Sequence, residues 1–221
     1  MSGTSFFAIR LSLQVALTAT ALLAPVGIFF AYILARGRFR GKELLDVVLT
    51  LPLVLPPTVT GYYLVILFGR NGPIGGPVYH LTGWTIMFTW EAAVLASFVV
   101  ALPLMVKISR AAIESVDRRL IDTAYTLGHS ETSTLFKVIL PLARKGIIAA
   151  LALSFARALG EFGATLMLAG NIPGRTSTAP LAIYSYASNG GWSQANSLVL
   201  LFTGIAAVFL FVANRFSRRV F

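Results

Sequence analysis

Five long runs of apolar residues, separated by short charged segments, organise this chain. The runs cover residues 9–35, 44–68, 88–108, 146–170 and 197–213. A membrane-spanning helix needs about 20 mostly apolar residues, so the first run has length to spare for tilt and the last is short. The pattern predicts an all-α polytopic membrane protein with five full transmembrane helices.

A sixth, shorter apolar segment lies between the fourth and fifth runs. Residues 177–188 include "APLAIYSYA", which is too short to span a bilayer and fits a short or re-entrant helix. The first run is followed by "RGRFRGK", so we interpret it as a retained helix and not as a cleaved signal peptide. We expect residues 1–221 to form a single transmembrane domain.

Composition supports a membrane protein and argues against a nucleic-acid binder. The chain is 57% hydrophobic with a mean hydropathy of +0.80, which excludes an ordinary soluble globular domain. The net charge of +10 comes from basic residues that alternate with membrane-length apolar runs, so we expect membrane lipid as a partner and no nucleic acid. With no cysteine, and with His80 and His129 isolated, we expect no metal site.

The distribution of basic residues predicts the orientation. Four follow the first run, seven lie from Lys107 at the end of the third run to Lys145 before the fourth, and three follow the fifth. The positive-inside rule makes this side cytoplasmic, with the N-terminus outside and the C-terminus inside. The opposite side carries the three tryptophans, as an aromatic belt would, and only three basic residues, which are Arg10, Arg70 and Arg175.

A mostly polar insert at about residues 115–138 lies in the longest predicted cytoplasmic connection. Ser115 or Asp117 can cap a first short helix, Gly128 can end it, Ser130 can cap a second, and Pro141 marks the exit into the fourth run. The apolar residues at helical spacing are Leu120, Ala124 and Leu127 in the first helix and Leu135 and Phe136 in the second. The bend suits insertion into a partner's groove, although a solvated hairpin fits the pattern equally well.

No nucleotide-binding or hydrolytic motif accompanies this insert. The sequence "GRFRGKE" has one residue too few between its glycines for a P-loop and ends in Glu, and no HExxH or nucleophile elbow occurs. We therefore expect no enzymatic activity and no cofactor on this chain. If ATP drives its function, ATP and Mg²⁺ bind to a separate partner.

The fourth run carries polar and small residues that suggest tight packing. Arg157 and Glu161 can pair at i, i+4 near the middle of a single span, flanked by Ser154 and Thr165. We favour a neutralised pair that stabilises the bundle over a polar lining of a substrate path, because a pair cancels the field that an anion would need. A ridge of small residues that would let another helix approach closely consists of Ala152, Ala156, Gly160 and Ala164.

Prolines interrupt the second run. Pro52, Pro56 and Pro57 precede Thr58 and Thr60. A packing kink is the simpler interpretation. The alternative is a broken helix whose freed amides and hydroxyls meet an oxyanion near the midplane.

The insert resembles the coupling loop of ABC importer permeases, usually written EAA-x3-G-x9-I-x-LP. Asp122, Thr123 and Ala124 stand at its start. The positions that follow in the motif are occupied by Leu127, Gly128, Val138, Leu140 and Pro141. In that family the loop docks on a separate ATPase subunit, and the resemblance implies the same contact here.

Two further stretches, "LPLVLPPTVTGYYL" and "RALGEFGATLMLAGNIPGRTSTAPLAIY", resemble the molybdate-type permease of this superfamily over nearly the whole chain. The resemblance implies the type I ABC importer permease fold and import of an oxyanion, molybdate first and tungstate or sulfate/thiosulfate as alternatives. It also makes the outer loop with Asn171, Pro173, Gly174 and Arg175 a docking or gate element.

The partners implied are a second copy of the chain, two cytoplasmic ATP-binding cassette subunits and an extracytoplasmic oxyanion-binding protein. The location implied is the plasma or inner membrane. Two rival functions stand beside this one: a secondary transporter, which would need intramembrane coupling groups and usually internal repeats, and a membrane scaffold without transport.

Overall fold

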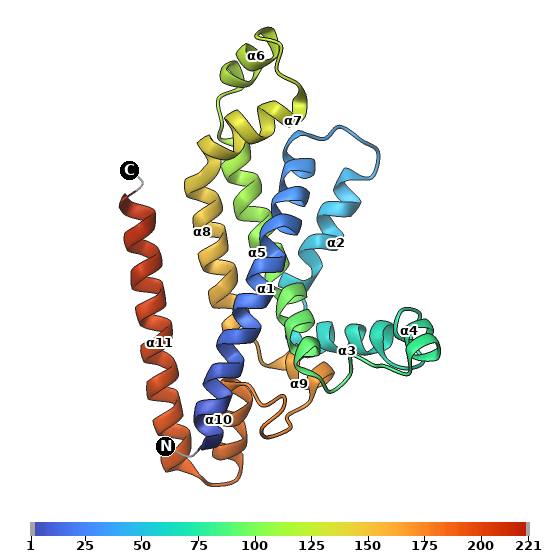
Figure 1. Ribbon diagram of the computed structural model, residues 1–221, viewed down its shortest axis with the longest axis vertical. Coiled ribbons are helices and arrows are strands. Elements are labelled where there is room, and N and C mark those ends of the chain that lie inside the picture. Colours follow the sequence, from blue (N-terminus) through green and yellow to red (C-terminus); the bar gives the residue numbers. More distant parts are fainter. Residues whose placement is uncertain (1–2, 220–221) are drawn as a thin grey trace.

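Helices form most of the chain in the computed structural model, which describes residues 3–219 without the side chains of residues 214 and 216–219 (Figure 1). The side chains of Arg218 and Arg219, used above for orientation, therefore lie outside the described residues. The helices are α1 (Gly3–Arg36), α2 (Lys42–Val54), α3 (Pro57–Phe68), α4 (Gly75–Thr82), α5 (Trp90–Glu114), α6 (Arg118–Thr126), α7 (Glu131–Thr134), the π-helical turn η1 (Leu135–Ile139), α8 (Leu140–Leu159), α9 (Gly163–Ala169), α10 (Ala179–Ser188) and α11 (Trp192–Arg219).

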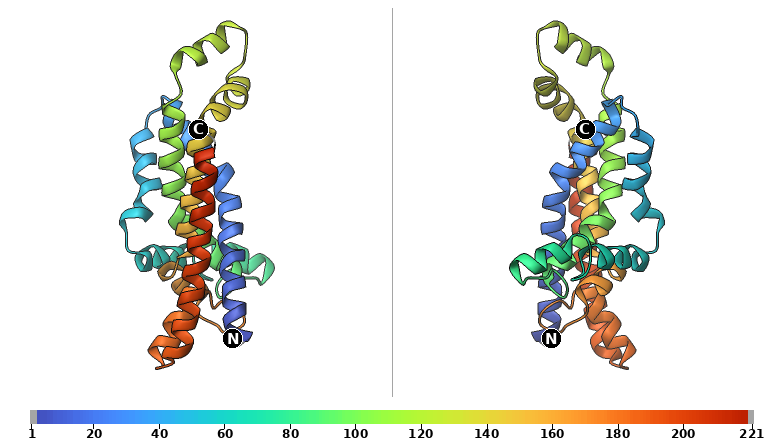
Figure 2. Two further views of the ribbon diagram at one scale, coloured as in Figure 1. Left: turned by 90° about the vertical axis from the view of Figure 1, so that its left-hand side faces the viewer. Right: turned by 90° about the vertical axis from the view of Figure 1, so that its right-hand side faces the viewer.

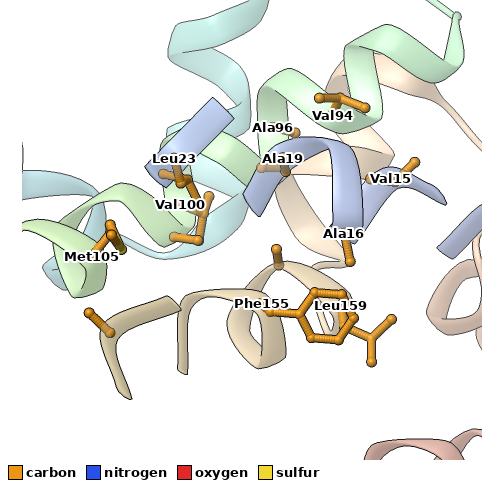
Figure 3. Packing of buried hydrophobic residues seen from close by; sticks show 14 of the residues in the cluster. Val15, Ala16, Ala19, Leu23, Val94, Ala96, Val100, Met105, Phe155 and Leu159 are labelled. Atoms are coloured by element: carbon orange, nitrogen blue, oxygen red, sulfur yellow. The ribbon is translucent and has the colours of Figure 1, made fainter. Parts of the chain in front are cut away.

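The core lies where α1, α5 and α8 pack together. Small residues let these helices approach closely: Ala16 and Ala19 of α1 and Ala96 of α5 are fully buried, and Val100 and Met105 fill the space beside them (Figure 3). Most residues in the apolar stretch of α5 are buried, so α5 is the central helix. In contrast, α11 stands at one side and contacts α8 through the Phe155 and Phe209 rings, whose centroids are 4.2 Å apart.

The number of spans agrees with the sequence pattern, and three of the five are single helices. Four helices of the described chain are long and apolar enough to cross a membrane, and a bent pair makes up a fifth span. The first and third predicted spans correspond to α1 and α5. The fifth is longer than predicted, because α11 begins at Trp192 and not at Ser197.

The second predicted span is not one helix, and its break is much sharper than a packing kink. The chain bends by 119° between α2 and α3, around Leu55 and Pro56, so α3 lies across the long axis of the bundle (Figures 1 and 2). Pro57 is the first residue of α3. A backbone N–H at this position would have no acceptor within the helix, so the N–H that proline lacks is not missed. Pro52 lies within α2 without ending it, so the break comes from the Pro56–Pro57 pair.

The fourth predicted span also breaks, at a place where the sequence has no proline. Helix α8 ends at Leu159, and the separate helix α9 begins at Gly163. At its other end, α8 begins before the predicted span, because α7, η1 and α8 form one continuous helical stretch, residues 131–159. Pro141 therefore lies within the first turn of α8 and does not mark an exit from a separate helix.

The uncertain sixth segment is α10, a helix of ten residues that is too short to span. Its start is fixed by a long-range contact, since the Ala179 N–H donates to the Ser12 hydroxyl of α1 over 2.7 Å. Ala179 and Ala182 are buried against Ala8 and Ile9 of α1 and against Leu198 of α11. The segment is thus a short helix that joins two spans at the end of the bundle opposite α6.

Charged side chains hold α2 against α5. Asp46 of α2 contacts Lys107 Nζ at 2.7 Å and Arg110 Nη1 at 3.0 Å, and Arg110 Nε contacts Glu114 at 2.8 Å. Only Leu49 of α2 is buried, so apolar packing contributes little along this helix. A network of partly buried pairs stabilises more than isolated surface pairs do.

The broken halves of the second and fourth spans pack on each other, as α3 crosses α9. A methyl group built on Gly61 would lie 2.8 Å from the Cα atom of Ala164, and one built on Gly163 would lie 3.0 Å from the Cβ atom of Pro57. Both distances are shorter than ordinary van der Waals contact. The two backbones can therefore lie this close only because glycine faces the partner helix on each side.

We expect Gly61→Val to destabilise the protein, because the new side chain would force α3 and α9 apart. Overpacking of this kind costs about 1–3 kcal/mol. Thermal unfolding of the purified chain in detergent micelles measures the effect. Gly204→Val is the matched control, because open space surrounds the Cβ position of Gly204 in α11. Equal melting temperatures for the two variants would contradict a close α3–α9 contact.

Candidate functional site

The polar insert projects beyond the bundle as a bent pair of helices (Figures 1 and 2). Asp117, one of the two predicted caps, accepts the Arg119 N–H at 2.9 Å and starts α6. Gly128 follows α6 with φ +83°, a left-handed conformation that costs glycine little. Ser130 accepts the Ser133 N–H at 3.3 Å and starts α7. These turn elements lie where the sequence predicts them.

Part of the predicted apolar face of α6 is turned toward the chain itself. Ala124 is buried together with Ile121, which joins the main core. Leu120 and Leu127 are 49% and 75% exposed, and Phe136 of η1 is 64% exposed. We call these three exposed apolar residues of the insert the tip surface.

The rest of the predicted coupling motif surrounds this surface or continues into α8. Asp122 and Thr123 are exposed, and the Thr123 hydroxyl donates to the Arg119 carbonyl at 2.7 Å. Val138 and Leu140 are half-buried, and Pro141 is exposed. The π-helical turn ends with the Leu140 N–H bonded to Leu135 O, immediately before Pro141, which has no N–H to donate.

A contact that the sequence does not indicate ties the insert to α1. The Tyr32 hydroxyl donates to Glu131 Oε1 at 3.0 Å, joining the C-terminal end of α1 to the first residue of α7. Thr134 and Ile139 are buried on the same stretch. The insert is thus anchored on one side and continuous with α8 on the other.

Arg157 and Glu161 do pair, but not on one uninterrupted helix. Arg157 lies in the last turn of α8 and Glu161 in the break before α9, with Arg157 Nη1 and Glu161 Oε2 2.8 Å apart. The other carboxylate oxygen of Glu161 accepts the Ala164 N–H at 2.8 Å. Since the Glu161 side chain is 1% exposed, its charge is balanced by one guanidinium and by the first turn of α9.

The break also divides the polar stripe and the small-residue ridge predicted on the fourth span. Ser154 is buried on α8, whereas Thr165 is buried on α9. The Ser154 and Thr60 hydroxyls are buried and have no hydrogen-bond partner among the residues that the structure describes. On the ridge, Ala152 and Ala156 are half-buried and Gly160 is exposed, while Ala164 is buried against α3. A continuous ridge on one helix is therefore wrong, and the half-exposed face of α8 is free within the described chain.

Thr58 and Thr60 lie at the start of α3. A methyl group built on Gly163 would lie 3.1 Å from the Thr58 backbone nitrogen, so Thr58 borders the break of the other span. Thr58 is thus brought next to α9, and Thr60 is buried two residues further along α3.

The predicted outer loop is a compact turn held to α10. Asn171 Nδ2 donates to Ser185 Oγ at 2.6 Å. The Ile172 carbonyl accepts N–H groups from three successive residues, which are Arg175, Thr176 and Ser177. Pro173, Gly174 and Arg175 form the exposed tip of this turn.

Comparison with known proteins agrees with this architecture. Residues 24–221 match the family described as binding-protein-dependent transport system inner membrane component. The molybdenum transport system permease protein ModB of Escherichia coli K12 is 46% identical over 212 residues, which cover 96% of this chain and 93% of ModB. ModB of Haemophilus influenzae is 44% identical over 214 residues, with 96% and 93% covered.

A solved structure shows the same fold. A bacterial ABC transporter involved in the import of alginate superposes with a TM-score of 0.82 and 16% identity, over 100% of this chain and 81% of that chain. The chain has the type I ABC importer permease fold, and it belongs to the family of binding-protein-dependent inner membrane transport components, as a multi-pass permease.

Proposed function

We propose that this permease is the transmembrane subunit of an ATP-driven importer whose cargo is molybdate. The observation that carries the proposal is the 46% identity to a molybdenum permease over nearly the whole of both chains. Tungstate is the first alternative, because it is a tetrahedral dianion of nearly the same size and shape. Sulfate or thiosulfate is the second.

In the proposed orientation the end that bears α6 faces the cytoplasm. The connections after α1 and α5, which carry most of the basic residues, meet at this end (Figure 1). Trp192 starts α11 at the opposite end, and Trp84 and Trp90 flank the start of α5. This arrangement supports an N-terminus outside and a C-terminus inside.

The tip surface is the proposed contact for the ATPase subunits, which would bind ATP and Mg²⁺. Leu120, Leu127 and Phe136 are exposed on a segment that projects out of the bundle, where lipid does not cover them in the proposed orientation. An exposed apolar ridge on a short bent segment fits a groove on a partner protein. The chain would thus receive mechanical work through this contact.

The continuous helix from α7 to α8 supports a way to transmit that work. Because residues 131–159 form one helical stretch, movement of the tip surface would displace α8 along its length down to the break near Glu161. ATP binding would draw two such inserts together and turn the bundles outward, and hydrolysis would reverse the change.

A second copy of the chain would complete the translocation path. The half-exposed face of α8 with Ala152 and Ala156, and the exposed Gly160 at its end, offer small residues on which another helix can pack. A path on the shared axis would hold the anion weakly, because strong sites release slowly. Specificity would then lie mainly in the binding protein that docks at the outer end, with the tip of the 171–175 loop among its contacts.

The Arg157–Glu161 pair is proposed to stabilise the break and not to bind cargo. Glu161 would repel a dianion, and its charge is already used by Arg157 and by the Ala164 N–H. Thr58 and Thr60 at the neighbouring break remain candidates for the path lining, since Thr58 lies beside α9 and Thr60 is buried on the same helix, α3.

Reconstituted transport tests the proposal directly. We expect liposomes that contain the permease and its ATPase partner, supplied with molybdate-loaded binding protein, to accumulate molybdate only when ATP is present on the ATPase side. Binding protein loaded with tungstate or sulfate ranks the other anions. Uptake by the permease alone, driven by an ion gradient, would instead identify a secondary transporter, and no uptake of any oxyanion would favour the scaffold.

We expect Leu127→Glu to abolish co-purification with the ATPase and ATP-dependent uptake, because a charge would enter the middle of the tip surface. Burying an unpaired charge costs several kcal/mol, so binding should fall at least about 100-fold. Thr126→Glu is the matched control, because Thr126 is exposed on another face of the same helix. Wild-type uptake by the Leu127 variant, with the ATPase still bound, would contradict the coupling role.

We expect Arg157→Met to destabilise the chain strongly, because it leaves the buried Glu161 carboxylate without its counter-charge. Removing one partner of a buried pair costs about 3–5 kcal/mol, and the partial exposure of Arg157 reduces this figure. The double variant Arg157→Met, Glu161→Gln should recover the melting temperature, because glutamine still accepts the Ala164 N–H. If the double variant melts normally but no longer transports molybdate, the pair belongs to the path and a purely structural role is wrong.

A further inference from the structure

A large cavity opens at the end of the molecule opposite α6. Its volume is about 1010 Å³, and it lies between the second half of α3, the turn at residues 69–72, the loop at residues 83–89 and the outer loop that carries Arg175. The 83–89 loop joins it to the crossing of the broken helices, because the Phe88 N–H donates to the Leu168 carbonyl of α9 at 3.2 Å. The cavity therefore borders the region proposed as the path.

Two guanidinium groups line this cavity and no carboxylate does. Arg70 comes from the turn after α3 and Arg175 from the tip of the outer loop, more than 100 positions later in the sequence. Neither forms an ion pair with any residue in the described part of the chain. The Arg70 guanidinium lies over the Tyr79 ring, 5.0 Å from its centroid, which restricts the side chain without neutralising its charge.

The walls of the cavity also contain neutral hydrogen-bond donors, and the backbone of the loop at residues 83–89 is constrained. Asn71 and Trp84 are among the residues that line the cavity, and their side chains carry an amide and an indole N–H that can donate to an anion. Phe88 has φ 60°, a conformation that is unfavourable for a bulky residue, and it is held by the Leu168 carbonyl. The loop that carries Trp84 is thus fixed against α9.

The charge distribution of the whole chain leaves this end positive. Six of the eight acidic residues lie at the α6 end, in α2, at the end of α5 and in the insert. Of the other two, Glu161 is paired with Arg157, and Glu91 starts α5 without lining the cavity. Arg10, Arg70 and Arg175 are exposed on the outer half of the chain, so an anion that approaches this end meets a field that attracts it.

We propose that Arg70 and Arg175 form an entry site for a free tetrahedral oxyanion at the outer mouth of the permease. This inference rests on the proposed function, since it names the place where the released cargo is first held. Two guanidinium groups match a dianion such as molybdate, whereas a phospholipid phosphodiester carries a single charge. The cavity is far larger than such an anion, so the anion would stay partly hydrated and leave readily, as transport requires.

Molybdate titration of the purified chain in lipid-free maltoside micelles tests the site, with tryptophan fluorescence as the readout because Trp84 lines the cavity. We expect a saturable signal that Trp84→Phe removes and that weakens as salt is raised. Arg70→Gln with Arg175→Gln should lower the apparent affinity at least about tenfold. Arg10→Gln, a change at the third outer arginine, should leave it unchanged.

Two further variants and a lipid measurement sharpen the result. The variant Arg70→Lys, Arg175→Lys keeps both positive charges but loses the planar guanidinium groups. It should bind molybdate better than the glutamine pair and worse than wild type. Mass spectrometry counts phospholipid that co-purifies with each variant. If the glutamine pair loses bound phospholipid while molybdate affinity stays the same, the site holds a lipid phosphate and the entry-site proposal is overturned.

Reconstituted uptake separates this inference from the proposed function. At saturating loaded binding protein, the glutamine pair should import molybdate more slowly than wild type while ATPase binding is unaffected. Equal uptake by wild type and the glutamine pair would overturn the entry site and leave the importer intact. If neither wild type nor the glutamine pair imports molybdate, yet molybdate affinity in micelles still falls when both arginines are replaced, the importer assignment fails and the anion site stands.

Discussion

The close contact between the backbones of α3 and α9 is the constraint on which this structure depends. Both helices are the second halves of broken spans, and a break inside a bilayer leaves backbone groups that must be satisfied by protein. Gly61 and Gly163 let the halves meet without intervening side chains. Glu161 completes the arrangement, because one carboxylate binds Arg157 and caps the first turn of α9. Each break is thereby stabilised by the other.

From this crossing the molecule extends in two directions with different physical character. Toward α6, long packed helices and the continuous 131–159 stretch make a stiff connection, with the Tyr32–Glu131 hydrogen bond as a second attachment. Toward the outer end, short helices and turns surround an open cavity lined by two arginines that form no ion pair within residues 3–219. A rigid side that receives movement and an irregular side that meets an anion are what a permease driven by a separate ATPase needs.

Charge placement follows the same division. Inside the bundle, Arg157 is matched by Glu161, and at the α6 end Asp46 is shared by Lys107 and Arg110. These pairs hold helices together and present little net charge. The unmatched positive charge of the outer end lies on exposed loops, where desolvation costs little and a passing anion can still be attracted.

The sequence by itself determined the elements whose signals are local. Apolar length marked α1 and α5, and the cap and turn residues Asp117, Gly128 and Ser130 marked the insert, because each acts on its own few neighbours. Only the tertiary structure decided that the fourth span breaks after Leu159, that Pro141 lies inside a helix and that Arg70 and Arg175 line one cavity. A helix in a membrane can end only where other groups satisfy its freed backbone. One such group here is the Ser97 hydroxyl of α5, which donates to the Ala158 carbonyl at 3.4 Å and lies 61 positions away in the chain.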